Sequence, residues 1–199
     1  AVSRRVQADV LDGELVGEVE QNVTEHLLQC LPIQAGPSAA VGSLVAFTDG
    51  VPDRKNYRKF RIRTVPGADD FAMMYEVLSR RYRNKERLPE LIVVDGGKGQ
   101  LGVAQAVMKD LQIDGVELIG LAKERDEENP GKNTPGKSED RVFLPGRKEP
   151  IYLSRWPAAF FLLQRVRDEA HRFAIAYHRK LRQKGELQSL LDKIPGIGP

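Results

Sequence analysis

Residues 91 to 101 carry the sequence Leu91-Ile-Val-Val-Asp-Gly-Gly-Lys-Gly-Gln-Leu101. The apolar run that opens this stretch is typical of a strand covered on both faces, and Asp95 stands at its carboxyl end, where open α/β sheets place their ligands. The glycines that follow allow close approach to a ligand, and Lys98 adds a positive charge at the start of the next helix. The pattern predicts metal-assisted phosphate chemistry. The alternative is a strand-to-helix turn that merely needs glycine.

A second informative stretch lies at residues 160–181, near the other end of the chain. Its apolar residues recur at intervals of three and four, which predicts an amphipathic helix. Arg167, His171 and His178 fall beside one another on an adjacent face, because residues three, four and seven apart share one side of a helix. Two histidines among several arginines suit contact with a phosphate backbone. The alternative is a basic helix surface that faces solvent.

The distribution of positive charge says more than its total, which is a formal +3. Arg61 and Arg63 share one face of a predicted strand, because side chains alternate along a strand. Other basic residues cluster at 80–87 and 165–182. We expect at least one of these clusters to follow the phosphates of a nucleic acid, which gives affinity without sequence specificity.

Periodicity and turn residues predict an α/β fold in which a mixed sheet is flanked by helices. The expected elements are strands at 41–47 and 57–63, a helix from about 69 to 83, the strand that ends at Asp95, a helix at 99–111, a strand at 116–122, a polar loop at 123–140, a hairpin at 142–153 and a helix from 157 to about 184.

Composition bounds the class of protein. The chain has 199 residues, 41% of them hydrophobic and 30% charged, which suits one sizeable globular domain with appendages. It has no run of eighteen apolar residues and no signal-peptide pattern, so we expect a cytoplasmic protein that does not contact a membrane. Cys30 is the single cysteine, which excludes a disulfide within the chain and a cysteine-based zinc site.

Seven collinear blocks resemble the C-terminal endonuclease half of UvrC, the incision subunit of bacterial nucleotide excision repair. The blocks are Val41-Gly-Ser-Leu-Val-Ala-Phe-Thr-Asp-Gly50, Asn56-Tyr-Arg-Lys-Phe-Arg-Ile62, Pro66-Gly-Ala-Asp-Asp-Phe-Ala-Met-Met74, Val94-Asp-Gly-Gly-Lys-Gly-Gln100, Gly120-Leu-Ala-Lys123, Val142-Phe-Leu-Pro-Gly146 and Arg167-Asp-Glu-Ala-His-Arg-Phe-Ala174. The resemblance implies an RNase H-like fold with an Asp, Asp, His triad and a divalent metal, Mg²⁺ or Mn²⁺. In this chain Asp95 would be the second aspartate and His171 the histidine.

The first aspartate of that triad has no clear counterpart. The family carries it on the opening strand, but this chain has no Asp or Glu between Glu25 and Asp49. Alignment on Cys30 places Pro32 at that position, whereas alignment on Ile33-Gln34 and the following glycine places Gln29 there. Neither residue can replace an anionic ligand of a hard cation. Proline also argues against an intact central strand at this point.

Three explanations for the missing aspartate stay open. The site is degenerate and the chain is a DNA- or protein-binding module, or another carboxylate substitutes, or the opening strand is partly missing. The candidate substitutes are Asp49, Asp69 and Asp70. A weaker alternative is another metal-dependent phosphotransferase or recombinase on the same fold.

The resemblance further implies incision of double-stranded damaged DNA on the 5′ side of a lesion. Lys98, Lys123 and Arg167 are the residues expected to stabilise phosphate charge, with Arg61, Arg63 and His178 as further contacts to DNA. The partner UvrB would bind parts of the full-length protein outside these residues. The expected organisation is a polar leader at 1–28, the endonuclease domain at 29–185, and the truncated start of a helix-hairpin-helix element at 186–199.

Overall fold

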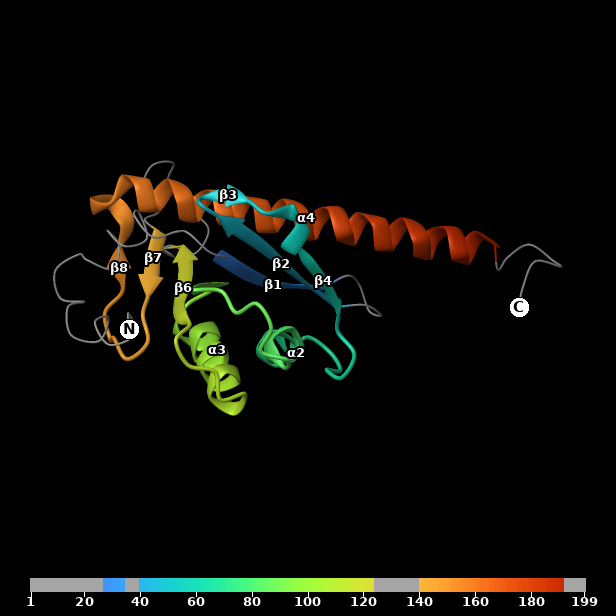
Figure 1. The fold of residues 1–199 in the computed structure, drawn as a ribbon. Helices are drawn as coiled ribbons and strands as arrows, with labels where there is room; N and C mark the ends of the chain where they lie inside the picture. The colour runs from blue at the N-terminus through green and yellow to red at the C-terminus, as the bar shows by residue number, and fades with distance from the viewer. Residues whose placement is uncertain (1–26, 35–39, 124–139, 192–199) are drawn as a thin grey trace, which may run out of the picture.

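The computed structural model describes residues 27–34, 40–123 and 140–191 of the chain (Figure 1). One mixed sheet has the strand order β3-β2-β1-β5-β6-β7-β8, and β4 pairs with the outer side of β2. Its strands are β1 (Leu27–Gln34), β2 (Ala40–Thr48), β3 (Val51–Pro52), β4 (Arg58–Arg61), β5 (Leu91–Asp95), β6 (Glu117–Lys123), β7 (Asp140–Phe143) and β8 (Ile151–Tyr152). The helices are η2 (Arg54–Asn56), α2 (Asp70–Tyr82), α3 (Lys98–Asp110), η3 (Leu153–Arg155) and α4 (Pro157–Leu191).

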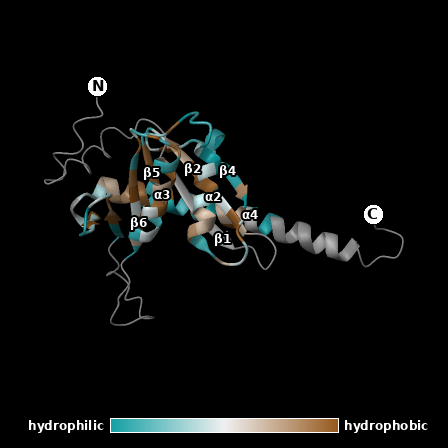
Figure 2. Ribbon diagram, turned by 90° about the horizontal axis from the view of Figure 1, so that it is seen from below, coloured by the Kyte–Doolittle hydropathy of each residue, from teal (hydrophilic) through white to brown (hydrophobic). Residues whose placement is uncertain are grey.

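The helices form a layer on each face of the sheet. Figure 1 shows α4 along one face and α2 with α3 on the other. Side chains of β5 alternate between the two layers: Val93 packs in the cluster that includes α4, whereas Ile92 and Val94 pack in the cluster that includes α2 and α3. Figure 2 shows hydrophobic colouring along β5 and β2, as expected for strands covered on both faces. The alternation places Asp95 on the α4 face.

The expected fold class is confirmed, since the described residues form an α/β mixed sheet flanked by helices. The expected element order is found, with differences of extent at several ends; β7, for example, begins at Asp140 rather than at 142. The strand expected at 57–63 ends at Arg61, where the backbone turns toward α2. The last helix continues through the expected boundary at residue 185 to Leu191. The leader to residue 26, the polar loop at 124–139 and the tail at 192–199 lie outside the described residues.

The opening strand β1 forms in spite of Pro32. It pairs with β2 along its whole length, from Leu27↔Phe47 to Gln34↔Ala40, but with β5 only as far as Cys30↔Val94. Pro32 therefore lies where β1 has a partner on one side only, as at a sheet edge. A missing backbone N–H is tolerated in such a position.

Among the described residues, no helix is both long enough and apolar enough to cross a membrane.

Candidate active site at the carboxyl end of β5

The turn after β5 is shaped by glycines on two strands. Gly96 has a φ of 153°, and its N–H donates to the carbonyl of Leu121 on β6 over 2.8 Å. A Cβ at Gly120 would lie 2.7 Å from the carbonyl oxygen of Gly96, closer than real contacts allow. Glycine at 120 therefore lets the turn cross β6 closely, which fixes the direction of the backbone directly after Asp95.

Asp95 and His171 come together on the α4 face, as the sequence predicted for residues of one site. The Nε2 of His171 lies 3.9 Å from a carboxylate oxygen of Asp95. The two side chains are 49% and 26% exposed, so a ligand can reach both from solvent. The pair joins the end of a central strand to a helix 76 residues further along the chain.

The pKa of the Asp95 carboxyl is raised above its usual value. Burial is the largest cause; Asp140 acts in the same direction, and the positive groups of His171, Arg167 and Lys123 oppose it. Within the described part of the chain, no hydrogen bond to this carboxylate is found. Asp95 is thus a partly buried acid with no donor among the described residues, a state that favours a cation or a proton as its partner.

Asp140 is a residue of this region that the sequence did not single out. It begins β7 and is almost fully buried. Both of its oxygens accept from Arg167, from Nη1 over 2.8 Å and from Nη2 over 2.9 Å. Arg167 itself is buried. The sequence predicted that it binds a phosphate, but in this structure its guanidinium binds a protein carboxylate.

Two lysines differ in their relation to Asp95. Lys123 ends β6, is exposed, lies in register with Asp140 and is close enough to lower the pKa of Asp95. Lys98 is the first residue of α3, which belongs to the layer on the other face of the sheet. Its exposed side chain starts from the same edge of the sheet as Asp95. Lys123 is therefore the more direct neighbour of the Asp95–His171 pair.

The three carboxylates considered as substitutes lie elsewhere. Asp49 comes directly after β2, near Phe47. Phe47 is level with Leu27 of β1, and Leu27 is level with Leu91 of β5. Asp49 therefore lies near the opposite end of β5 from Asp95. Asp69 caps α2 by accepting from the N–H of Ala72, and Asp70 is the first residue of that helix. Both belong to the layer opposite α4.

The register of β1 and β5 also addresses the missing aspartate. Cys30 is level with Val94 in the last pair between the two strands, and Leu31 is the next residue of β1. This position lies between Gln29 and Pro32, the two residues that sequence alignment suggested, and it too carries no charge. The strand β1, which pairs with β5, therefore offers no acid near Asp95.

A divalent cation fits the donors at this site in part. Among the described residues no donor bonds to the Asp95 carboxylate, and His171 supplies an exposed imidazole, whereas both oxygens of Asp140 accept from Arg167. No group of three acids, histidines or cysteines suited to a metal is found in the ranges that the structure describes. Mg²⁺ is commonly held by one or two carboxylates together with water and substrate phosphate oxygens, so the donor set suits a cation that the substrate helps to bind.

The remaining predicted contacts lie along β4 and α4. Arg61 ends β4 and Arg63 follows it, and both are exposed. Their backbones are held by α2, because Arg80 donates to the carbonyl of Arg61 and the N–H of Arg63 donates to Glu76. His178 lies two helical turns beyond His171 on α4, and its side chain is outside the described residues.

A family model for the UvrC RNase H endonuclease domain matches residues 34–175. The chain belongs to this family. The match includes Asp95, Asp140, Arg167 and His171, and it begins at the last residue of β1. The RNase H-like fold that the sequence blocks implied is thereby confirmed.

Curated relatives agree with this assignment. The UvrABC system protein C of Syntrophus aciditrophicus is 61% identical over 163 residues, which is 82% of this chain and 26% of the relative. The protein of the same name from Geobacter metallireducens is 56% identical over 162 residues, 80% of this chain and 26% of the relative. The chain thus spans about a quarter of the length of the curated relatives it matches.

Two solved structures resemble the chain more distantly. Human ENDOV has a TM-score of 0.47 at 15% identity and covers 81% of this chain and 87% of its own. Endonuclease V from Ciona intestinalis, solved with a 24mer DNA containing an inosine, has a TM-score of 0.39 at 13% identity, with coverage of 64% and 69%.

Proposed function

We propose that this chain is a DNA endonuclease domain of nucleotide excision repair that hydrolyses a phosphodiester bond with the help of a divalent cation. The observation that carries the proposal is the Asp95–His171 pair, 3.9 Å apart and open to solvent at the carboxyl end of a central strand. Membership in the UvrC endonuclease family supports it.

Each residue at the carboxyl end of β5 has a separate role in this proposal. Asp95 would hold the cation together with a substrate phosphate oxygen, and His171 would orient the attacking water or accept its proton. When bound, the cation would polarise the scissile phosphate and lower the pKa of water. Lys123, beside Asp95, would stabilise the charge that develops on the phosphate, and Lys98 would contact a neighbouring phosphate at the same edge.

Arg167 acts as a positioning residue in this proposal. Its two hydrogen bonds to Asp140 tie α4 to β7, one helical turn from His171. This tie fixes the position of His171 relative to Asp95, since β7 and β5 belong to one sheet.

The finer assignments follow the family. We propose Mg²⁺ or Mn²⁺ as the cation, double-stranded damaged DNA as the substrate, incision on the 5′ side of the lesion, and UvrB as a partner that binds segments outside these residues. We propose the cytoplasm as the place of action.

The test is a cleavage assay on a labelled nicked duplex with MgCl₂, MnCl₂ or a chelator. The wild-type chain is compared with Asp95→Asn and with Asp114→Asn, a matched change at an exposed acid after α3. We expect metal-dependent cleavage that Asp95→Asn abolishes and Asp114→Asn retains. Calorimetry with Mn²⁺ and the same duplex should show saturable binding that only Asp95→Asn removes.

Two results would reject the proposal. Cleavage that survives in Asp95→Asn would place the chemistry elsewhere. Tight DNA binding by the wild-type chain, without cleavage and without Mn²⁺ binding, would indicate the binding module that the missing first aspartate also allows.

A further inference from the structure

A hollow of about 550 Å³ lies between β4 and α4, away from Asp95. It is lined by Arg54, Tyr57, Arg58, Lys59, Arg172 and Phe173. Four of these six side chains are cations and the other two are aromatic. A site of this composition suits a phosphate with its attached sugar or base.

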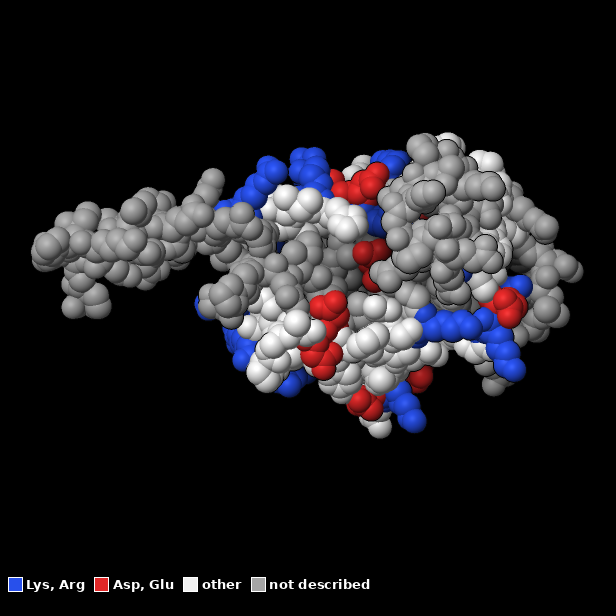
Figure 3. All heavy atoms as spheres, turned by 180° about the vertical axis from the view of Figure 1, so that it is seen from behind, with Lys and Arg blue, Asp and Glu red and all other residues white. Residues whose placement is uncertain are grey.

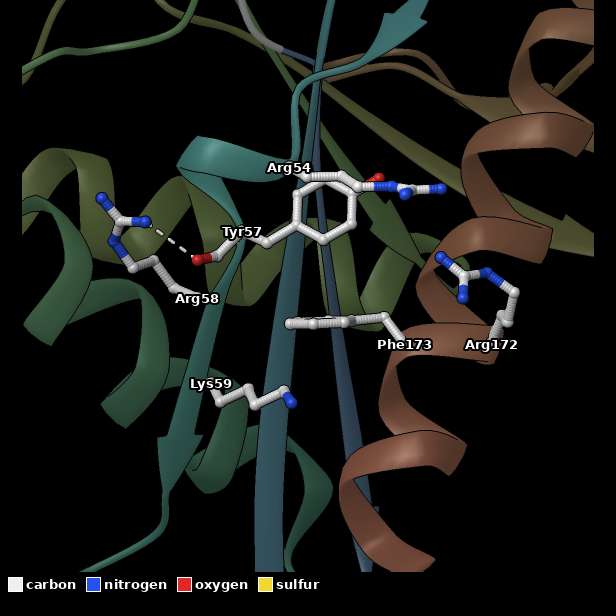
Figure 4. Close-up of a pocket in the computed structure, with 6 residues that line it drawn as sticks. All are labelled: Arg54, Tyr57, Arg58, Lys59, Arg172 and Phe173. Carbon is white, nitrogen blue, oxygen red and sulfur yellow. Dashed lines mark hydrogen bonds between the residues drawn. The ribbon is translucent and has the colours of Figure 1, made fainter. Parts of the chain in front are cut away.

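The side chains of the hollow converge from two elements. In Figure 4, Arg54 from η2 and Arg172 from α4 extend to the same side of the Tyr57 ring, while Arg58 points away and donates to the carbonyl of Tyr57. Lys59 lies over the ring of Phe173, with Nζ 4.6 Å from the ring centre. Three cations therefore face the hollow.

The floor of the hollow is held rigidly. The rings of Tyr57 and Phe173 pack edge to face with centres 5.0 Å apart. The hydroxyl of Tyr57 donates to Glu169 over 2.8 Å, and Glu169 also accepts from Arg172. The pKa of Tyr57 is raised by its burial and then by this hydrogen bond, so the ring stays neutral. Glu169 cancels one of the facing charges and leaves a net positive surface.

The hollow and Asp95 lie on the same row of the sheet but on opposite flanks of α4. Lys59 is level with Ser43 of β2, and Ser43 is level with Leu31 of β1. Leu31 directly follows Cys30, which is level with Val94, the residue before Asp95. Three strand spacings separate the two ends of this row, about 14 Å. Helix α4 packs on β1 and β2, the strands in between.

The position of α4 between the hollow and Asp95 decides whether single-stranded or double-stranded DNA can contact both. A single strand in contact with both the hollow and Asp95 would have to pass over a helix about 10 Å wide. A duplex avoids this, because its major groove is about 12 Å wide and admits an α-helix between its two backbones. Figure 3 shows lysine and arginine side chains along the margin where α4 crosses the molecule.

We propose that the hollow binds a phosphate of the DNA strand opposite the one that reaches Asp95, with α4 in the groove between the strands. The proposal rests on the proposed function and assigns the hollow a task that the reaction itself does not require. It makes double-stranded DNA the preferred ligand of this face of the chain.

The test measures binding by fluorescence anisotropy with a 20-base-pair duplex and with one of its strands alone, in chelator. Chelator removes cleavage, so a failed nuclease assay does not affect the result. The variant Arg54→Ala/Lys59→Ala is compared with Arg83→Ala/Lys109→Ala, an exposed pair in the opposite layer, with Arg83 directly after α2 and Lys109 on α3.

We expect the hollow variant to lose about tenfold in affinity for the duplex and to reduce the salt dependence by about one phosphate contact. Its affinity for the single strand should stay within about twofold of wild type, and the control should match wild type on both ligands. Thermal melts followed by circular dichroism confirm folding. An equal loss on single strand and duplex, or no loss on either, overturns the proposal.

Discussion

Arg167 and Asp140 bind each other through two hydrogen bonds of 2.8 and 2.9 Å in a buried position next to Asp95. The pair brings an arginine of α4 and an aspartate of β7 out of water together, and each satisfies the charge of the other. Removal of one partner is therefore expected to cost far more than removal of both.

The first prediction concerns this pair. Arg167→Met should lower the free energy of unfolding by about 3–5 kcal/mol, because Asp140 then stays buried and unpaired. Arg167→Met with Asp140→Leu should recover most of that loss. Urea denaturation measures both variants, and Arg165→Met, at an exposed position, is the control. A double variant no more stable than the single one would contradict the paired role.

The second prediction concerns Asp95 and pH. Its folded pKa lies above the usual 3.8, so its ionisation costs stability as pH rises through the folded pKa, and the cost is absent below 3.8. Asp95→Asn should therefore unfold at a higher temperature than wild type at pH 7. The difference should vanish near pH 3.5. Asp114→Asn should show no such trend, and a stabilisation by Asp95→Asn that persisted at pH 3.5 would reject this explanation.

The third prediction concerns Glu76, a buried acid of α2. Burial raises its pKa, but hydrogen bonds from Thr64, Arg80 and Arg63 outweigh burial and hold the pKa below the usual 4.5. Its contribution to stability is therefore present above pH 4.5 and is lost as pH falls through the folded pKa. Glu76→Gln should cost about 1–3 kcal/mol at pH 7.

The measurement for Glu76 is urea unfolding at several pH values. The gap between wild type and Glu76→Gln should narrow in acid. A gap independent of pH would show that shape rather than charge holds the segment after β4. Glu90→Gln, a change at an exposed acid, is the control.

The fourth prediction concerns the turn that follows Asp95. Gly120→Ala would place its Cβ 2.7 Å from the carbonyl oxygen of Gly96, so the backbone must shift, at a cost of about 1–3 kcal/mol. We expect weaker Mn²⁺ binding as well, because the shift moves Asp95. Gly102→Ala on α3 meets open space and should stabilise the chain by about 0.5–1 kcal/mol. Calorimetry and thermal melts decide; unchanged Mn²⁺ affinity in Gly120→Ala would separate the turn from the site.

The sequence alone predicted Asp95 and His171 as site residues, but it did not predict the pairing of Asp140 with Arg167. Asp95 and His171 stood out because one ends an apolar run and the other lies on a patterned helix. Asp140 did not, because it follows a polar loop and its partner Arg167 is 27 residues away. The pairing of β6 with β7 places Asp140 level with Lys123, at the edge of the sheet where Asp95 lies.

The same limit applies to the hollow and to β1. The strand pattern gave Arg61 and Arg63 as the basic contacts, whereas the hollow is made by Arg54 and Lys59 with a side chain of α4. No periodicity could show that η2 faces that helix. Proline at position 32 suggested a broken strand, and the register shows that only one side of β1 is paired there.

His171 and Arg172 are consecutive residues of α4, yet His171 lies near Asp95 and Arg172 lines the hollow. Successive helical residues diverge by about 100°, so a single rigid rod sets the angle between the two positions. A rotation or slide of α4 over the sheet would disturb both at once. Under the two proposals, DNA binding at the hollow and the alignment of His171 with Asp95 therefore both depend on where this one helix lies on the sheet.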